Sequence, residues 1–221
     1  MIQVRNVSKS YPHAREPVLA LDGVDLQVDE GDFVVIHGAS GSGKTTLLLA
    51  LGGMLRPTSG SVVFRDSDLY SLSVRRRSQY RRRCVGFIFQ KFFLVPYLTA
   101  LDNIRMALAV RGYRGNRERV IVDLATRLGM ADRLSHRPSQ LSVGEQQRIA
   151  MARAVVGEPQ LILADEPTGN LDRANSEIFA HFLSDEHRRG RTIVLVTHDE
   201  SLLHLGNRTV QLRAGRVAAA P

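Results

Sequence analysis

The sequence has little that would support a disulfide-stapled, secreted or membrane-spanning protein. Its single cysteine, Cys84, excludes an internal disulfide and fits a reducing compartment; we expect it to be a buried small hydrophobic residue. The start, Met1 to Asn6, lacks the apolar segment of a secretion signal. The longest apolar stretch, Leu47 to Leu55, falls well short of the roughly 20 residues that a membrane span requires. We therefore expect a cytosolic chain.

Acidic residues are fewer than basic residues, but the excess of positive charge is local. The chain has 30 lysines and arginines against 22 acidic residues, and six arginines between Arg75 and Arg83 supply six of the eight net positive charges. On a helix these six point to all sides and leave no apolar face, which predicts a solvated surface helix. Anionic lipid heads or acidic groups of a membrane partner are the alternatives. No aromatic platform accompanies the charge, so nucleic acid is not expected as a partner.

The distribution of apolar residues predicts an α/β protein. Alternating apolar and polar residues at Ile2 to Val7 and Val24 to Val28 predict half-buried, antiparallel strands. Continuous apolar runs at Phe33 to Ile36, Leu161 to Ala164 and Ile193 to Val196 predict strands of a parallel sheet covered on both faces. Helical periodicity dominates between Phe92 and Pro159, and the tail from Thr209 to Val217 predicts a hairpin turning at Gly215. The chain thus predicts a mixed sheet core, residues 1–90 and 159–221, with an inserted helical lobe, residues 91–158.

A glycine-rich loop stands between the apolar run at 33–36 and a leucine-rich helical run at 47–51. Its glycines let several backbone N–H groups point inward at phosphates, and the following helix adds its positive end. Lys44 is expected to reach the β- and γ-phosphate oxygens, and the Thr45 hydroxyl to bind Mg²⁺. The predicted ATP-binding residues here are Gly38, Ala39, Ser40, Gly41, Ser42, Gly43, Lys44, Thr45 and Thr46.

A second motif is an apolar strand, Leu161 to Ala164, that ends in two carboxylates. Asp165 is placed to hold Mg²⁺, directly or through water, and Glu166 to polarise an attacking water. An ordinary strand end with an acidic turn would explain the pattern less well, because the phosphate loop is present too.

A third motif spans Leu141 to Arg148. Ser142 and Glu145, three positions apart, form a predicted capping box for a helix. The same geometry gathers a hydroxyl, the Gly144 N–H and a helix dipole, which is a second phosphate site. One ATP is already held on one side by the first loop, so we expect Ser142, Gly144 and Glu145 to meet the nucleotide of a second copy. The sequence therefore predicts a homodimer with ATP sandwiched between chains.

In their order along the chain, Gly38 to Thr45, Leu141 to Arg148 and Leu161 to Asp172, the three motifs resemble the ATPase subunits of ABC transporters. The resemblance covers essentially the whole chain. The resemblance implies a P-loop NTPase (RecA-like) fold and ATP hydrolysis. It also implies roles for Gln90 at Mg²⁺ and the water, for His198 at the γ-phosphate, for Asp172 across the dimer interface and for Tyr11 against adenine. One departure is Val143, where the family usually has glycine, and valine restricts the backbone there.

Within this family, the segments Val85 to Gln90 and Leu94 to Ile104 look most like the subgroup of macrolide export, lipoprotein release and cell division. The resemblance implies an integral membrane permease as partner, a location at the cytoplasmic face of the inner or plasma membrane, and export or extraction of a substrate. An ATP-gated regulator of a cell-envelope complex, without transport, uses the same chemistry and remains the alternative. The short spacing between the first and third motifs and the single cassette disfavour relatives that act on DNA or ribosomes.

Overall fold

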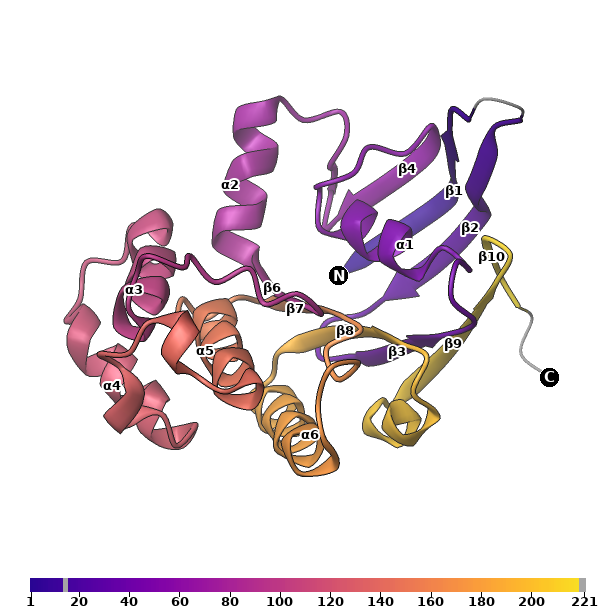
Figure 1. The fold of residues 1–221 in the computed structure, drawn as a ribbon. Coiled ribbons are helices and arrows are strands. Elements are labelled where there is room, and N and C mark those ends of the chain that lie inside the picture. The colour runs from indigo at the N-terminus through magenta and orange to yellow at the C-terminus, as the bar shows by residue number, and fades with distance from the viewer. Residues whose placement is uncertain (14–15, 219–221) are drawn as a thin grey trace.

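A computed structural model describes residues 1–13 and 16–218 and contains two sheets (Figure 1). The first is antiparallel in the order β2-β1-β4-β5. Its strands are β1 (Ile2–Tyr11), β2 (Val18–Val28), β4 (Ser59–Phe64) and β5 (Ser67–Asp68). The expected antiparallel pairing of the first two strands is confirmed by the register Ile2 to Val28.

The second sheet has the order β10-β9-β3-β8-β7-β6. Its strands are β3 (Phe33–His37), β6 (Val85–Phe89), β7 (Leu161–Asp165), β8 (Thr192–Thr197), β9 (Arg208–Arg213) and β10 (Arg216–Val217). All neighbouring pairs are parallel except the terminal hairpin of β9 and β10, which turns at Ala214 and Gly215. The predicted mixed sheet and hairpin are therefore confirmed.

Helices flank this sheet and form a lobe beside it (Figure 1). Between β6 and β7 lie α3 (Ala100–Arg111), α4 (Arg117–Arg127) and α5 (Val143–Val155), where the periodicity predicts helices. Thr99 caps α3 by accepting a hydrogen bond from the Asp102 N–H, and Gly112 ends the helix in a left-handed conformation. The remaining elements are α1 (Lys44–Leu51), α2 (Val74–Cys84), α6 (Arg173–Arg188) and the 3₁₀ turns η1 (Ala131–Arg133), η2 (Pro138–Gln140) and η3 (Glu200–Leu205).

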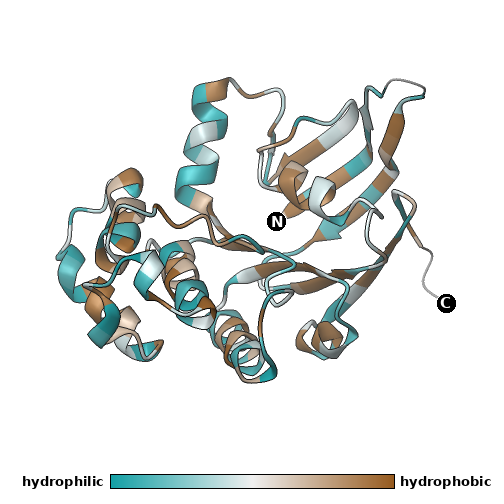
Figure 2. Ribbon diagram, in the orientation of Figure 1, coloured by the Kyte–Doolittle hydropathy of each residue, from teal (hydrophilic) through white to brown (hydrophobic). Residues whose placement is uncertain are grey.

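Two hydrophobic cores lie on opposite faces of the six-stranded sheet (Figure 2). Along β3, Phe33 and Val35 belong to one core, whereas Val34 and Ile36 belong to the other, because successive side chains of a strand point to opposite faces. The first core is continuous with the buried side chains of α3, α4 and α5. The helical lobe is therefore packed on the sheet through a shared core.

Helix α2 is polar almost all round, as expected for a solvated helix (Figure 2). Its one buried side chain, Tyr80, anchors it to α1 by donating a hydrogen bond to the Leu51 carbonyl at 2.9 Å. Cys84 at the end of α2 is only half-buried, so the expectation of a buried residue is wrong, although burial still raises the pKa of its thiol. None of the described helices is long and apolar enough to cross a membrane.

Candidate nucleotide site

The loop between β3 and α1 is shaped by glycine. A Cβ atom on Gly38 would collide with the Leu212 carbonyl oxygen on the neighbouring strand β9. Gly43, which caps α1, has φ 102°, in the region that disfavours residues with a side chain. The loop therefore lies against β9 and turns into α1 along a path that only glycine permits at these two positions.

Lys44 is buried, with 5% of its side chain exposed, in the first turn of α1. Its ammonium group donates to the carbonyls of Gly38 at 2.8 Å and Ala39 at 3.1 Å, and it lies 3.2 Å from Glu166 Oε1. The loop thus curls around a fixed positive charge that faces the end of β7.

Thr45 and Asp165 join the loop to the strand with two carboxylates. The Thr45 hydroxyl donates to Asp165 Oδ1 at 2.8 Å. Burial raises the pKa of Asp165, and the negative charge of Glu166 acts in the same direction. A hydroxyl oxygen and a carboxylate oxygen are ligands that suit Mg²⁺, which commonly takes its other ligands from phosphates and water. A bound cation would also compensate the cost of burying the Asp165 charge. This donor set therefore fits the predicted ion.

Glu166 follows Asp165 and has φ 43°, which is uncommon for a residue with a side chain. Its Oε2 accepts a hydrogen bond from the His198 backbone N–H at 3.1 Å and lies 2.7 Å from His198 Nδ1. Because a carboxylate only accepts, Nδ1 carries the proton in this contact. Strands β7 and β8 are parallel neighbours, so their carboxyl ends bring Glu166 and His198 together.

These side chains line one groove of about 480 Å³. Its walls include Lys44, Thr45, Thr46, Glu166, His198 and Gln90. Ala20, which the sequence does not single out, also lines it, because Gly43 packs directly against the Ala20 carbonyl. Side chains from the loop and from the ends of three strands therefore converge in one place.

The remaining predicted residues lie outside this groove. Ser142 and Glu145 form the expected capping box: Ser142 Oγ accepts from the Glu145 N–H at 3.3 Å, and Glu145 Oε2 accepts from the Ser142 N–H at 2.8 Å. The hydrogen bond from the Ser142 backbone, helped by the Arg133 guanidinium at 2.9 Å, lowers the pKa of Glu145 from 4.5 to about 2.

Asp172 caps α6 by accepting hydrogen bonds from the backbone and side-chain nitrogens of Asn175, which lower the pKa of Asp172. Asn175 also accepts from Arg148 at 2.8 Å, and its amide fills the space where a side chain on Gly144 would lie. Sequence reasoning missed Asn175, whose only local signal is its place three residues after a capping aspartate. This amide ties the starts of α5 and α6 together.

Tyr11 ends β1 with 37% of its surface exposed. The Lys9 ammonium lies 5.2 Å from the centre of its ring. Tyr11 is not among the residues that line the groove described above.

The sequence is similar to known proteins over nearly its whole length. The model of the family described as "ABC transporter" matches residues 21–169. The lipoprotein-releasing system ATP-binding protein LolD of Syntrophotalea carbinolica is 44% identical over 98% of this chain and 96% of its own length. The macrolide export ATP-binding/permease protein MacB of Chlorobaculum tepidum is 40% identical over 98% of this chain, which spans only 33% of that relative.

Two solved structures have the same fold. The dimeric structure of MJ0796, a bacterial ABC transporter cassette, superposes with a TM-score of 0.92 at 38% identity, covering 99% of this chain and 97% of that one. A dimeric post-hydrolysis state of MJ0796 bound to ADP and Pi gives a TM-score of 0.89 at 37% identity with the same coverage.

Proposed function

Because this chain belongs to the ABC transporter family, as one of its ATP-hydrolysing subunits, we propose that it closes with a second copy around two ATP molecules to drive a membrane partner. The observation that carries the proposal is the convergence of Lys44, Thr45 and the Glu166 and His198 pair on one groove. Asp165 is joined to this groove by its hydrogen bond with Thr45. This set combines a fixed cation, a metal-binding pair and a carboxylate that can polarise water.

Nucleotide binding is assigned to residues 38–46. The buried Lys44 ammonium neutralises phosphate charge, and the backbone N–H groups of the loop and the start of α1 donate to phosphate oxygens. Tyr11 offers a ring face to the base, by stacking. Thr45, Asp165 and Gln90 would hold Mg²⁺, which supplies positive charge to the β- and γ-phosphates when bound.

Hydrolysis is assigned to Glu166, His198 and Gln90. Glu166 orients and polarises the attacking water, and His198 fixes the Glu166 carboxylate while facing the γ-phosphate. The Lys44 ammonium lies 3.2 Å from Glu166 Oε1 and so helps to fix the position of this carboxylate beside the phosphate loop. Gln90 lines the same groove and is assigned to the positioning of the water.

The second copy completes the site. Ser142, Gly144 and Glu145 begin α5 and Asp172 begins α6, and neither helix start lines the groove of its own chain. A helix N-terminus whose capping hydroxyl can also donate a hydrogen bond is a phosphate site, so these residues are assigned to the nucleotide of the partner copy. The dimeric structures of MJ0796 support this arrangement.

The membrane partner is assigned to the region around Gln90 and to the helical lobe, residues 91–158, which moves against the core lobe, residues 1–90 and 159–221. The chain then acts at the cytoplasmic face of the inner or plasma membrane. The names of LolD and MacB favour release or export of a substrate over regulation without transport. Val143, half-exposed in the first turn of α5, is placed to affect closure.

Replacement of Glu166 by glutamine tests the proposal. ATP binding should persist, because the Gly38 to Thr46 loop is untouched, while hydrolysis should fall at least about 100-fold with loss of the general base. The variant should also accumulate as a dimer with ATP, measured by size-exclusion chromatography. Glu158→Gln, a change of an exposed carboxylate outside the groove, is the matched control. Hydrolysis by Glu166→Gln at the parental rate would refute the assignment.

A further inference from the structure

Helices α5 and α6 begin at exposed residues that the proposed function assigns to the nucleotide of the partner copy. Ser142 caps α5 and Asp172 caps α6, each by accepting a hydrogen bond from the backbone N–H three residues ahead. The two caps belong to different helices. Groups that act on one ligand need a fixed relative position, so the two helix starts must be held in register with each other.

The Asn175 side chain lies between the two helix starts. Its Nδ2 atom donates to Asp172 Oδ1 at 2.9 Å, and its Oδ1 accepts from Arg148 Nη1 of α5 at 2.8 Å. A guanidinium only donates and a carboxylate only accepts, so these two partners fix the orientation of the amide. One side chain therefore connects the cap of α6 to the second turn of α5.

Asn175 also packs directly on the backbone of α5. Gly144 is buried in the first turn of this helix, and a Cβ atom on it would lie 2.2 Å from Asn175 Oδ1. At that distance the amide would have to move. Glycine at position 144 thus lets the Asn175 amide reach its place beside the helix start.

The surrounding contacts hold both ends of this bridge. Asp172 also accepts from the Asn175 backbone N–H at 2.8 Å, so one residue makes two hydrogen bonds to the capping carboxylate. Gln147, the neighbour of Arg148, is buried and donates to the Pro167 carbonyl at 2.8 Å. This second bond fixes the body of α5 against the segment that leads to α6. Asn175 extends the connection to the exposed ends of the two helices.

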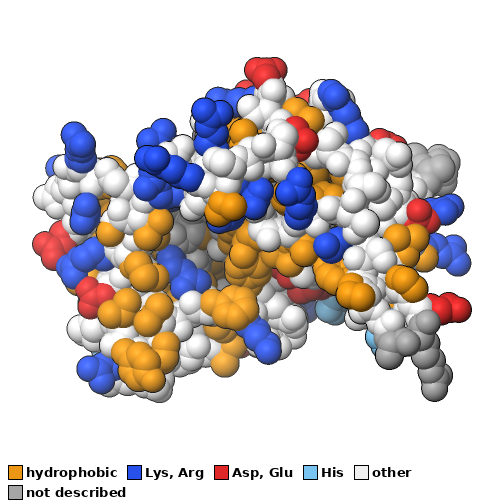
Figure 3. Space-filling model, turned by 90° about the horizontal axis from the view of Figure 1, so that it is seen from above, with side chains coloured by type: hydrophobic (Ala, Val, Ile, Leu, Met, Phe, Trp, Pro, Cys, Tyr) orange, Lys and Arg blue, Asp and Glu red, His pale blue; other side chains and the backbone are white. Residues whose placement is uncertain are grey.

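The arginine-rich surface of α2 takes no part in this bridge. Seen from above, many lysine and arginine side chains lie on the face to which α2 belongs (Figure 3). Helix α6 lies on the other side of the six-stranded sheet (Figure 1). The alignment of the two helix starts is therefore separate from the positive cluster between Arg75 and Arg83.

We propose that Asn175 is a positioning residue that aligns the starts of α5 and α6, so that Ser142 and Asp172 reach the nucleotide of the partner copy together. The inference rests on the proposed function and adds a residue that acts through these two caps. Asn175 aligns the surface that a chain offers to its partner. Its loss therefore damages the site on the partner and leaves the phosphate loop of its own chain intact.

Asn175→Ala removes both side-chain hydrogen bonds and gives the first test. ATP hydrolysis by this variant should fall at least about tenfold, because displaced binding groups no longer act together. Binding of a fluorescent ATP analogue, measured at concentrations too low for dimerisation, should be unchanged, because the loop at residues 38–46 is untouched. Parental hydrolysis by Asn175→Ala would overturn the proposal.

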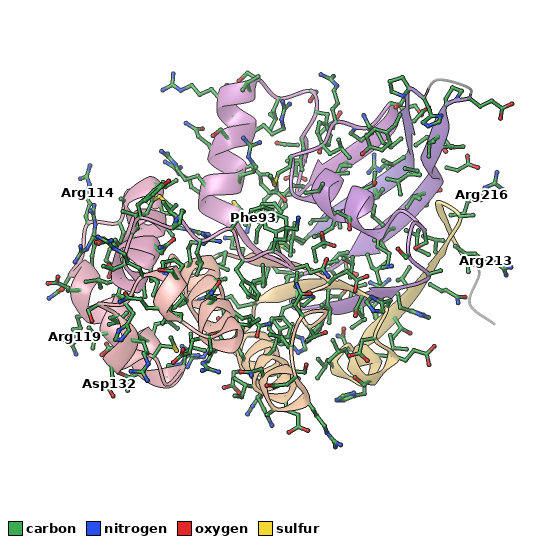
Figure 4. The ribbon with its side chains drawn as sticks, viewed as in Figure 1. Phe93, Arg114, Arg119, Asp132, Arg213 and Arg216 are labelled. Atoms are coloured by element: carbon green, nitrogen blue, oxygen red, sulfur yellow. The ribbon has the colours of Figure 1, made fainter. Side chains whose placement is uncertain are left out.

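Asn116→Ala is the matched control. Asn116 caps α4 by accepting from the Arg119 N–H at 3.1 Å, and Arg119 lies at the outer edge of the helical lobe (Figure 4). This variant also loses an asparagine hydrogen bond at a helix start, and it should keep the parental rate. An equal fall in hydrolysis in Asn116→Ala would show that the loss of any such bond is enough, and the special role of Asn175 would be refuted.

Mixtures of variants show which copy Asn175 serves. In a mixed dimer of Asn175→Ala and Lys44→Ala, the intact loop of the first chain meets the intact helix starts of the second. Half of the dimers in an equal mixture are mixed and carry one complete site out of two, so about a quarter of the parental rate should return. Asn175→Ala with Ser142→Ala should not recover, because both chains then offer damaged helix starts. Recovery with Ser142→Ala, or none with Lys44→Ala, would overturn the proposal.

Asn175→Asp repeats the test with a side chain of the same shape. Aspartate can still accept from Arg148 but cannot donate to Asp172, and its charge repels that carboxylate. It should recover with Lys44→Ala and not with Ser142→Ala, and circular dichroism shows that each variant is folded. The mixture of Lys44→Ala with Ser142→Ala tests the proposed function separately. Without recovery in that mixture, shared sites are wrong and this inference falls with them; with recovery there but not in the Asn175 mixtures, only the role of Asn175 is wrong.

Discussion

Replacing Glu145 by glutamine separates the charge of the α5 cap from its hydrogen bond. Glutamine can accept from the Ser142 N–H as glutamate does, but it loses the ionic contact with Arg133. The folded pKa of Glu145, about 2, lies below its ordinary value of 4.5. The charge therefore stabilises the fold above pH 4.5, and this contribution is lost as the pH falls toward 2.

The expected loss of folding free energy follows from the lowered pKa of Glu145. A difference of about 2.5 pKa units corresponds to at most about 3 kcal/mol, and solvent screening at this surface helix start reduces it to about 1 to 2 kcal/mol. For a chain of this length, that is a decrease of about 2 to 8 °C in the unfolding temperature of Glu145→Gln at pH 7.

The assay compares thermal unfolding of the parent and of Glu145→Gln by circular dichroism at several values between pH 7 and pH 3. The difference in unfolding temperature between the parent and Glu145→Gln should be constant down to about pH 5 and decrease below it. Glu158→Gln, which removes an exposed carboxylate elsewhere, is the control. Equal unfolding temperatures at pH 7, or a difference in unfolding temperature that stays constant down to pH 3, would refute the electrostatic explanation of the cap.

Three further changes test other parts of the account. Chains with Lys44→Ala or Ser142→Ala should each be inactive alone. In an equal mixture, half of the dimers would pair one variant with the other and carry one complete site out of two, so about a quarter of the parental ATPase rate should return. A mixture without activity would contradict shared sites. Gly38→Ala should abolish binding of a fluorescent ATP analogue, because the added Cβ collides with the Leu212 carbonyl; unchanged affinity would contradict this. Glu186→Gln should lower the free energy of unfolding by about 3 kcal/mol in urea titrations, because it removes the charge of a buried carboxylate that lies within ion-pair distance of three arginines. Hydrolysis at low temperature should persist.

Local patterns in the sequence predict most of this fold. The fully buried runs of β3, β7 and β8 identify a parallel sheet without further information, because strands covered on both faces have no polar side. The capping box at Ser142 is likewise complete within four residues. The phosphate loop is recognisable for the same reason, since its chemistry is built from neighbouring residues.

Other features depend on contacts that the order of residues does not reveal. Strands β1 and β2 are longer than the alternation predicts, because bulges shift their register after Val4 and interrupt the pattern. Strand β4 has no clear alternation and is missed. The contact of Lys44 with Glu166 joins residues far apart in the chain, and the amide of Asn175 links two helix starts only in the folded molecule.

The shared core of lobe and sheet has a consequence for recombination between related cassettes. Ile104 and Leu108 of α3 belong to the same continuous packing as Ile162 of β7 and Leu195 of β8. A chimaera that takes its inserted helices from one relative and its strands from another would combine side chains that do not match in size and shape. Their contacts in the core would leave voids or steric overlaps. A compatible exchange should therefore move α3, α4 and α5 together with β7 and β8, whose side chains complete the same core.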